Sequence, residues 1–342
     1  MARFVTFGEI MLRLKPPGNE RFLQSPVLEA TFGGGEANVA VALARFGCDT
    51  RYVSVVPAGA IGDACLGELR RHGVDVSRVV RKGSRLGIYF LEAGASQRPS
   101  VVIYDRGASA ISEARSGDIA WEEAFAGAQW FHITGITPAI SLSAAGLSLE
   151  AVRKARESGL TVSCDLNYRK NLWKYGKSAP EVMGEIVRHV DVVIANVEDC
   201  QKALGISVEA NVESERLDAG QYRRLAERVL SAHPHLSHLA ITLRESSSAD
   251  DNGWSAVMYT HGEFMVSRSY GIHDIVDRVG SGDTFAAGLL YGLTQLGDPR
   301  EALEFAAAAS CLKHSIPGDL PLLTAAEVRG FMGGSGSGRM QR

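Results

Sequence analysis

The chain has 342 residues, of which 45% are hydrophobic and 22% are charged, so it can bury a large core, and neither a disordered nor a fibrous protein fits this composition. The formal net charge is -3, which provides no broad basic field and excludes nucleic acid and an anionic membrane surface from the expected partners. The five cysteines form no Cys-x-x-Cys pair, so zinc-ribbon and thioredoxin-type sites are excluded as well.

Short runs rich in β-branched residues alternate with longer segments of helical period along the chain. The runs typical of strands lie at residues 4–7, 51–56, 130–134, 161–165, 190–195 and 239–243. The helical segments lie at residues 37–46, 63–72, 143–158, 179–189, 221–232, 284–296 and 300–314. This alternation predicts an α/β fold in which helices cover both faces of a mainly parallel sheet.

Two segments break this rhythm, at residues 11–32 and 86–106. The second contains two alternating runs joined by a turn-rich stretch at residues 94–99, the pattern of a β-hairpin. We expect both segments to form a small β-lid over one edge of the sheet. Exposed strands of this kind often pair with another copy, so a homo-oligomer, a dimer or larger, is expected.

The whole of residues 1–332 is expected to fold as a single domain. Residues 333–342 are rich in Gly and Ser and predict a flexible tail outside the fold. Residues 1–30 lack a basic region followed by an apolar run, and no apolar stretch is long enough to cross a bilayer. We therefore expect a cytoplasmic protein that binds small molecules and no membrane.

The strongest chemical signal lies at residues 277–283, which end in Gly280-Ser281-Gly282-Asp283 just before a helix of small residues. Small residues let backbone N–H groups approach an anion, and a helix start adds the positive end of its dipole. The dipole also favours an ionised carboxylate, so Asp283 is placed to accept a proton from a hydroxyl. This pairing predicts phosphoryl transfer to an alcohol, although a glycine turn with a capping Asp explains the motif alone equally well.

A second glycine cluster, at residues 33–35, opens the helix that carries Asn38. Its glycines permit close approach of a polyhydroxylated ligand, and the Asn38 amide can both donate and accept. Neither glycine cluster matches Gly-x-x-x-x-Gly-Lys-[Ser/Thr] or a dinucleotide-binding Gly-x-Gly-x-x-Gly, so P-loop and Rossmann sites are not expected.

Polar residues follow the run at residues 161–165. Alternation projects Asp165, Asn167 and Arg169 to one side of the chain. Because ligands of open α/β sheets bind beyond the carboxyl ends of strands, these side chains predict a binding site. A surface ion pair is the alternative.

Three motifs occur in a fixed order: GGGEANVA at residues 33–40, DLNYR at residues 165–169 and DRVGSGD at residues 277–283. This ordered set resembles the ribokinase or PfkB-like carbohydrate kinase family over residues 1–328 and implies a ribokinase-like three-layer sandwich. The stretches at residues 8–11, 135–139, 165–173 and 311–319 are similar to the subgroup that phosphorylates 2-keto-3-deoxygluconate.

The resemblance implies ATP as co-substrate, Mg²⁺ as cofactor and a role for each matching residue. It implies that Asp283 is the catalytic base and that the backbone of Gly280, Ser281 and Gly282 forms the anion hole. The implied sugar contacts are Gly34, Gly35, Asn38, Tyr89, Tyr104, Arg106, Arg169 and Asp319. The implied nucleotide contacts are Asn167, Asn196, Thr242, Arg244, Gly280 and Gly282, and Asp199 matches a Glu near the metal.

Arg106 and Arg169 suit an acidic sugar, because a guanidinium fork binds a carboxylate at two points. The resemblance therefore implies transfer of the γ-phosphoryl group of ATP to the terminal hydroxyl of 2-keto-3-deoxygluconate, giving 2-keto-3-deoxy-6-phosphogluconate. A kinase for a neutral ketose, a ketodeoxygalactonate kinase and a non-catalytic sugar-binding homologue remain the alternatives. Arg278 and Ser281 depart from the family motif, and residues 242–246 replace the family's Gly-rich nucleotide loop. These departures leave the adenine contacts and any monovalent-cation site unassigned.

Overall fold

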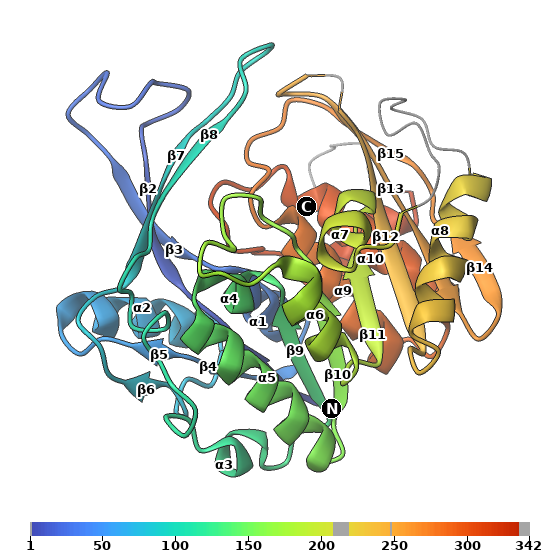
Figure 1. Ribbon diagram of the computed structural model, residues 1–342. Coiled ribbons are helices and arrows are strands. Elements are labelled where there is room, and N and C mark those ends of the chain that lie inside the picture. The colour runs from blue at the N-terminus through green and yellow to red at the C-terminus, as the bar shows by residue number, and fades with distance from the viewer. Residues whose placement is uncertain (1, 208–218, 247, 335–342) are drawn as a thin grey trace.

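The protein is described by a computed structural model over residues 2–207, 219–246 and 248–334. In these residues a nine-stranded sheet forms the centre, in the order β14-β13-β12-β11-β10-β9-β1-β4, with β15 paired to β13 (Figure 1). The strands are β1 (Arg3–Phe7), β4 (Asp49–Val53), β9 (Trp130–Thr134), β10 (Thr161–Asp165), β11 (Val192–Ala195), β12 (His238–Ser246), β13 (Asn252–Thr260), β14 (Glu263–Val266) and β15 (Tyr270–Ile272).

The six strands from β4 to β12 in this order pair in parallel, and only β13, β14 and β15 join antiparallel. Parallel strands need crossover connections, which here are helices. The carboxyl ends of the parallel strands therefore lie along one edge of the sheet. The predicted α/β architecture with a mainly parallel sheet is confirmed.

Helices cover both faces of this sheet, because successive strand residues point to opposite sides. Phe4 packs on one core with Leu43 and Phe285, while its neighbour Val5 packs on the other core with Phe131 and Leu147. The first face carries α1 (Gly35–Arg45), α9 (Ser281–Gln295), α10 (Pro299–Lys313) and α11 (Ala325–Met332). The second carries α3 (Trp121–Phe125), α5 (Leu142–Glu157), α6 (Ala179–Val187), α7 (Val197–Ala203) and α8 (Ala219–Ala232).

Most predicted elements occur with small shifts at their ends. The strands expected at residues 130–134 and 161–165 have those bounds, whereas the helices expected from residues 37 and 284 begin earlier, at Gly35 and Ser281. Both helices start inside glycine clusters, where backbone freedom allows the turn into the helix. The run at residues 51–56 is divided between β4 and β5 (Val55–Val56), and β5 pairs with β6 (Val80–Arg81) instead of the central sheet.

A second sheet of four strands stands beside the central one, at the left of Figure 1. Its order is β3-β2-β7-β8, with β2 (Met11–Lys15), β3 (Glu29–Gly33), β7 (Gly87–Glu92) and β8 (Val101–Asp105). Strand β8 is an edge strand whose side chains are exposed along its length. The four strands fall in the two segments expected to form a β-lid, and a lid movement and pairing with another copy stay predictions.

Two further helices complete the described elements: α2 (Ala60–Arg71) packs beside α1, and the short α4 (Ile136–Ile140) follows β9. In the described ranges, every helix is too short or too polar to cross a bilayer. Of the expected Gly/Ser-rich tail, residues 335–342 lie outside the described part of the chain. The single domain over residues 1–332 stays a prediction.

Candidate active site

A cavity of about 590 Å³ opens where the carboxyl ends of β10, β11 and β12 face the four-stranded sheet. Its walls come from segments far apart in the sequence, which the crossover connections bring to one edge of the sheet. It gathers sixteen of the residues expected in the site: Gly34, Gly35, Asn38, Tyr89, Tyr104, Asn167, Arg169, Asn196, Asp199, Thr242, Arg244, Gly280, Ser281, Gly282, Asp283 and Asp319.

The start of α9 forms one wall of the cavity. Gly280 precedes the helix with a φ of 82°, and no side chain caps the first turn. A Cβ at Gly280 would lie 2.2 Å from the backbone oxygen of Asp319, while one at Gly282 would meet nothing within 4 Å. Glycine is thus required at position 280 for close backbone packing, and the uncapped N–H groups beyond it suit an anion.

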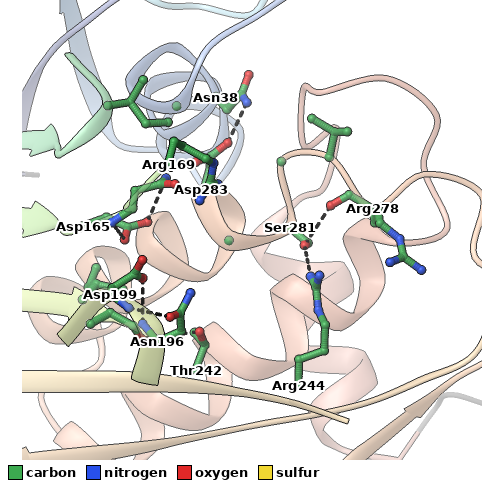
Figure 2. Close-up of a pocket in the computed structure, with 18 of the residues that line it drawn as sticks. Asn38, Asp165, Arg169, Asn196, Asp199, Thr242, Arg244, Arg278, Ser281 and Asp283 are labelled. Atoms are coloured by element: carbon green, nitrogen blue, oxygen red, sulfur yellow. Dashed lines mark hydrogen bonds between the residues drawn. The ribbon is translucent and has the colours of Figure 1, made fainter. Parts of the chain in front are cut away.

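Asp283 lies in the first turn of α9 and faces α1 across the cavity. Asn38 Nδ2 donates to Asp283 Oδ2 at 2.7 Å (Figure 2). Burial raises the pKa of Asp283 to about 6; Asp319 adds to this rise, and the hydrogen bond from Asn38 opposes it. A carboxylate with this pKa is ionised at neutral pH and can still accept a proton, as a general base must.

The glycine cluster at residues 33–35 lets the chain pass close to other groups. A Cβ at Gly33 would lie 2.0 Å from Asp319 Oδ2, and one at Gly34 would lie 2.0 Å from the backbone oxygen of Glu9. A larger residue at Gly33 would displace the Asp319 side chain, and one at Gly34 would require a shift of the backbone. The cluster therefore brings Asn38 and the Asp319 carboxylate to the same side of the cavity.

Two buried carboxylates, Asp165 and Asp199, lie near the ends of β10 and β11. Both oxygens of Asp199 are engaged at 2.8 Å, Oδ1 by the backbone N–H of Tyr168 and Oδ2 by that of Asn196. Burial raises the pKa of Asp199, and burial with the charges of Asp199 and Asp283 raises the pKa of Asp165 well above its usual value. This part of the cavity carries more negative than positive charge.

The donor set fits a magnesium ion that arrives with a phosphate ligand. No group of three or more His, Cys, Asp or Glu side chains in the described ranges is arranged to hold a metal. Mg²⁺, however, often uses only one or two carboxylates and completes its shell with water and phosphate oxygens. Asp165 and Asp199 offer that number of carboxylates, with Arg169 as a nearby cation.

Three arginines with neutral hydrogen-bond partners balance this negative region. Arg169 donates to the backbone oxygen of Tyr168, Arg278 to that of Ala249 and Arg244 to Ser281 Oγ at 3.3 Å. Figure 2 shows Arg169 beside Asp165 and Asp283, with Arg244 approaching Ser281 from the opposite side. Guanidinium groups without a carboxylate partner suit an anionic ligand.

Arg244 has the most constrained position of the three. Its guanidinium lies 5.2 Å from the centre of the Trp254 ring, its cross-strand neighbour on β13. Although solvent reaches Arg244 through the open cavity, the surrounding protein lowers its pKa to about 10, and the charges of Arg278 and Arg169 contribute. An anion bound here would relieve this repulsion.

The sequence profile of pfkB family carbohydrate kinases matches residues 1–321. The chain belongs to this family. A 2-dehydro-3-deoxygalactonokinase of Haloferax volcanii is 33% identical over 98% of this chain and 98% of that protein. A 2-dehydro-3-deoxygluconokinase of Bacillus subtilis is 26% identical over 92% of this chain and 90% of that protein.

The crystal structure of a 2-dehydro-3-deoxygluconokinase from Thermotoga maritima is also similar to this kinase. It superposes with a TM-score of 0.92 at 47% identity and covers 98% of this chain and 100% of that one. The fold is therefore ribokinase-like, and the chain is a carbohydrate kinase. The predictions of family, fold class and enzyme class are confirmed.

Arg106 is the one expected site residue that does not line the cavity of this kinase. Its guanidinium donates to Glu9 Oε2 and lies 5.5 Å from the centre of the Tyr104 ring. Glu9 is itself buried and accepts from Ser109 Oγ at 2.6 Å. In this structure an internal ion pair takes the charge of Arg106, and its contact with the sugar stays a prediction.

Residues that the sequence did not indicate also shape the cavity. Arg278, Trp254, Tyr222 and Glu198 line the cavity, and the buried Arg13 contacts it through Asp319. Arg278 lies within the motif at residues 277–283, where it differs from the family pattern, and that difference was the available signal. Trp254 gave no signal, because its place beside Arg244 depends on the register of two antiparallel strands.

Proposed function

We propose that this carbohydrate kinase transfers the γ-phosphoryl group of ATP to the terminal hydroxyl of 2-keto-3-deoxygluconate. One observation carries the proposal. Asp283, which accepts a hydrogen bond from Asn38, lies at the uncapped start of α9, and the guanidinium of Arg169 lies beside it (Figure 2). That arrangement combines a base, an anion hole and a carboxylate receptor. The names of the similar kinases, which refer to six-carbon deoxy-keto acids, support it.

In the proposed reaction, Asp283 accepts the proton of the sugar hydroxyl as its oxygen forms a bond to the γ-phosphorus. The bond from that phosphorus to the bridging oxygen breaks, and ADP leaves with the electron pair. Asn38 holds Asp283 Oδ2 in place. The N–H groups that follow Gly280 stabilise the charge on the transferring group, because they are fixed before the reaction begins.

The nucleotide would occupy the side of the cavity formed by β11 and β12. Arg244 and Thr242 on β12, with Asn196 and Asn167, offer donors for phosphate and ribose oxygens. Mg²⁺ bound with the nucleotide would neutralise charge on the phosphate oxygens, and Asp165 and Asp199 would hold it directly or through water. Asp199 would then act as it does in the described structure, as an acceptor fixed by two backbone N–H groups.

The sugar would occupy the side that faces the four-stranded sheet. Arg169 offers a fork for the substrate carboxylate. Asn38, Asp319 and the backbone of Gly34 and Gly35 offer partners for the hydroxyl groups. Tyr104 and Tyr89 approach from the four-stranded sheet, whose closure over the bound sugar would keep water from the phosphoryl group.

2-Keto-3-deoxygalactonate is a second candidate substrate. The Haloferax volcanii protein named for that sugar is 33% identical to this chain over nearly its full length. The two sugars share the carboxylate, the keto group and the terminal hydroxyl and differ in the configuration of one carbon. A cytoplasmic homo-oligomer with one kinase domain in each chain remains part of the proposal for either sugar.

The test is a coupled ADP-release assay with both epimers, fructose and ribose as substrates. We expect the highest kcat/KM for 2-keto-3-deoxygluconate, and phosphorus-coupled NMR of the product should place the phosphate on the terminal carbon. A preference for the other epimer would favour the second candidate. A preference for fructose or ribose would contradict the acid-sugar assignment.

A further inference from the structure

A fully buried arginine lies beneath the proposed site. Arg13, on β2 of the four-stranded sheet, is only 2% exposed. Its Nη1 donates to Asp319 Oδ1 at 2.6 Å, and its Nη2 donates to Asp277 Oδ2 at 2.5 Å. One guanidinium therefore joins the four-stranded sheet to two acidic residues from the C-terminal part of the chain.

The first of these residues, Asp319, lines the cavity. Its Oδ1 accepts a second hydrogen bond, from the hydroxyl of Tyr89 at 2.5 Å. Its Oδ2 lies where a Cβ at Gly33 would be, so it packs directly on that glycine. Arg13 and Tyr89 thus fix the rotation of the carboxylate that would meet the sugar.

The second residue, Asp277, begins the stretch that leads to Asp283. Asp277 Oδ1 accepts from the backbone N–H of Val279 at 3.0 Å, and Oδ2 accepts from that of Gly318 at 3.1 Å. It therefore joins the entry of the anion-hole loop to the loop that carries Asp319. Gly280 also packs directly against the backbone oxygen of Asp319, which is a second contact between these two loops.

The charges of this cluster balance. Lys313 is buried beside it, donates to the backbone oxygen of Ile316 at 3.0 Å and interacts with both Asp277 and Asp319. Burial lowers the pKa of Arg13, but Asp319, Tyr89 and Asp277 outweigh it and raise the pKa above its usual value. Two cations and two carboxylates are thus held away from water, where losing one leaves the others unpaired.

We propose that Arg13 is a positioning residue of the kinase: by holding Asp277 and Asp319 together, it fixes the anion-hole loop and the sugar-facing carboxylate in one geometry. The inference rests on the proposed function, because it assigns Asp319 to the sugar and residues 280–283 to the phosphoryl group. Arg13 also connects the four-stranded sheet directly to the anion-hole loop, residues 277–283. A shift of β2 would move both carboxylates together.

Arg13 also controls the electrostatic surroundings of Asp283. The groups that act on Asp283 are Asn38 on α1, Asp165 at the end of β10, Arg169 after it, Lys313 on α10, and Asp319. Asp319 raises the pKa of Asp283, and Arg13 neutralises much of that carboxylate's charge. Without the guanidinium the pKa of Asp283 should rise further, because the negative charge near it would increase.

The test compares Arg13→Lys and Arg13→Met with Arg85→Met in the full-length chain. Arg85 forms an exposed ion pair with Asp105 at 2.9 Å and provides a matched loss of one arginine–aspartate contact. For the Arg13 variants we expect kcat to fall about tenfold to a hundredfold, because small displacements of reacting groups have effects of that size. The acid limb of the kcat/KM profile should move to higher pH, and Arg85→Met should change neither quantity.

Arg13→Met removes one partner of a buried pair, so its folding is checked by thermal melting. If it does not fold, Arg13→Lys and Asp277→Asn, which keep charge or shape, are combined in a double-mutant cycle. We expect the two substitutions to be coupled, so that kcat of the double variant is little lower than kcat of the less active single variant.

Additive effects, or folded Arg13 variants with the kcat and pH profile of wild type, would overturn the proposal. All measurements use the sugar that the wild-type enzyme turns over best. A failure of the substrate assignment is therefore seen first, in the wild-type substrate panel, and is distinct from a failure of the role of Arg13.

Discussion

Two regions of the kinase differ in whether their arginines are paired with carboxylates. On β2 of the four-stranded sheet, Arg13 forms ion pairs with Asp277 and Asp319 and is buried. Across the cavity, Arg169 and Arg244 donate only to a backbone oxygen and a serine hydroxyl in the described residues. Paired charges hold a geometry, whereas charges left without a counter-ion are available to a ligand.

The same contrast separates the two arginines that the sequence offered for the substrate carboxylate. Arg106 is paired with Glu9 outside the cavity, and Arg169 faces the cavity with no ion pair to a carboxylate in the described residues. Their residue type is identical, and only the neighbours differ. Whether an arginine already has a carboxylate partner therefore decides which one can bind a substrate. Four experiments test the proposed site and this distinction.

Removing divalent ions should have the largest effect. The carboxylates Asp165 and Asp199 add negative charge beside the expected phosphate oxygens, so Mg²⁺ is needed to offset it, and excess chelator should reduce phosphoryl transfer to background. The ADP-release assay with and without EDTA measures this, and restoring free Mg²⁺ is the control. Full activity in chelator would show that the arginines alone are sufficient.

Asp283→Asn should have the next largest effect. The amide keeps the shape of the side chain but cannot take the proton, so kcat should fall at least about a hundredfold. ATP affinity, measured by equilibrium binding, should change little, because the nucleotide side of the cavity is untouched. Near-normal turnover would exclude Asp283 as the base.

Arg169→Ala and Arg106→Ala test the contrast between free and paired charge directly. Loss of a charge-assisted contact of about 1.5–3 kcal/mol corresponds to about a tenfold to hundredfold lower kcat/KM for the acid sugar. We expect that loss for Arg169→Ala, with fructose turnover affected much less. Arg106→Ala should lower the melting temperature and leave the acid-to-neutral preference unchanged. The reverse pattern would show that Arg106, and not Arg169, binds the substrate carboxylate.

The pH dependence should show the smallest effect. Because the pKa of Asp283 is raised to about 6, the base becomes protonated as the pH falls through that value, and kcat/KM should drop about tenfold for each further pH unit. The hydrogen bond from Asn38 lowers this pKa, so Asn38→Ala should move the acid limb to higher pH. A profile that stays flat to pH 5 would contradict the assignment of Asp283.

Much of the fold could be predicted because its signals are local. The β-branched runs at residues 130–134 and 161–165 became β9 and β10 with unchanged bounds. The glycine clusters marked two helix starts, since close backbone approach at positions such as Gly280 tolerates no side chain. The division of the run at residues 51–56 was not predictable, because the partner of β5 lies on a segment distant in sequence.

By itself, the sequence determined the family and the α/β class, and it marked Asp283, Asn38 and the glycines that surround them as candidate site residues. These follow from residue types within short motifs, whose chemistry depends little on the rest of the chain. Only the tertiary structure decided that Arg106 pairs with Glu9, that Arg169 forms no ion pair within the described ranges and that Arg13 joins Asp277 to Asp319. The function of a charged side chain depends on the counter-charges within a few ångströms of it, and those come from segments that meet only when the chain folds.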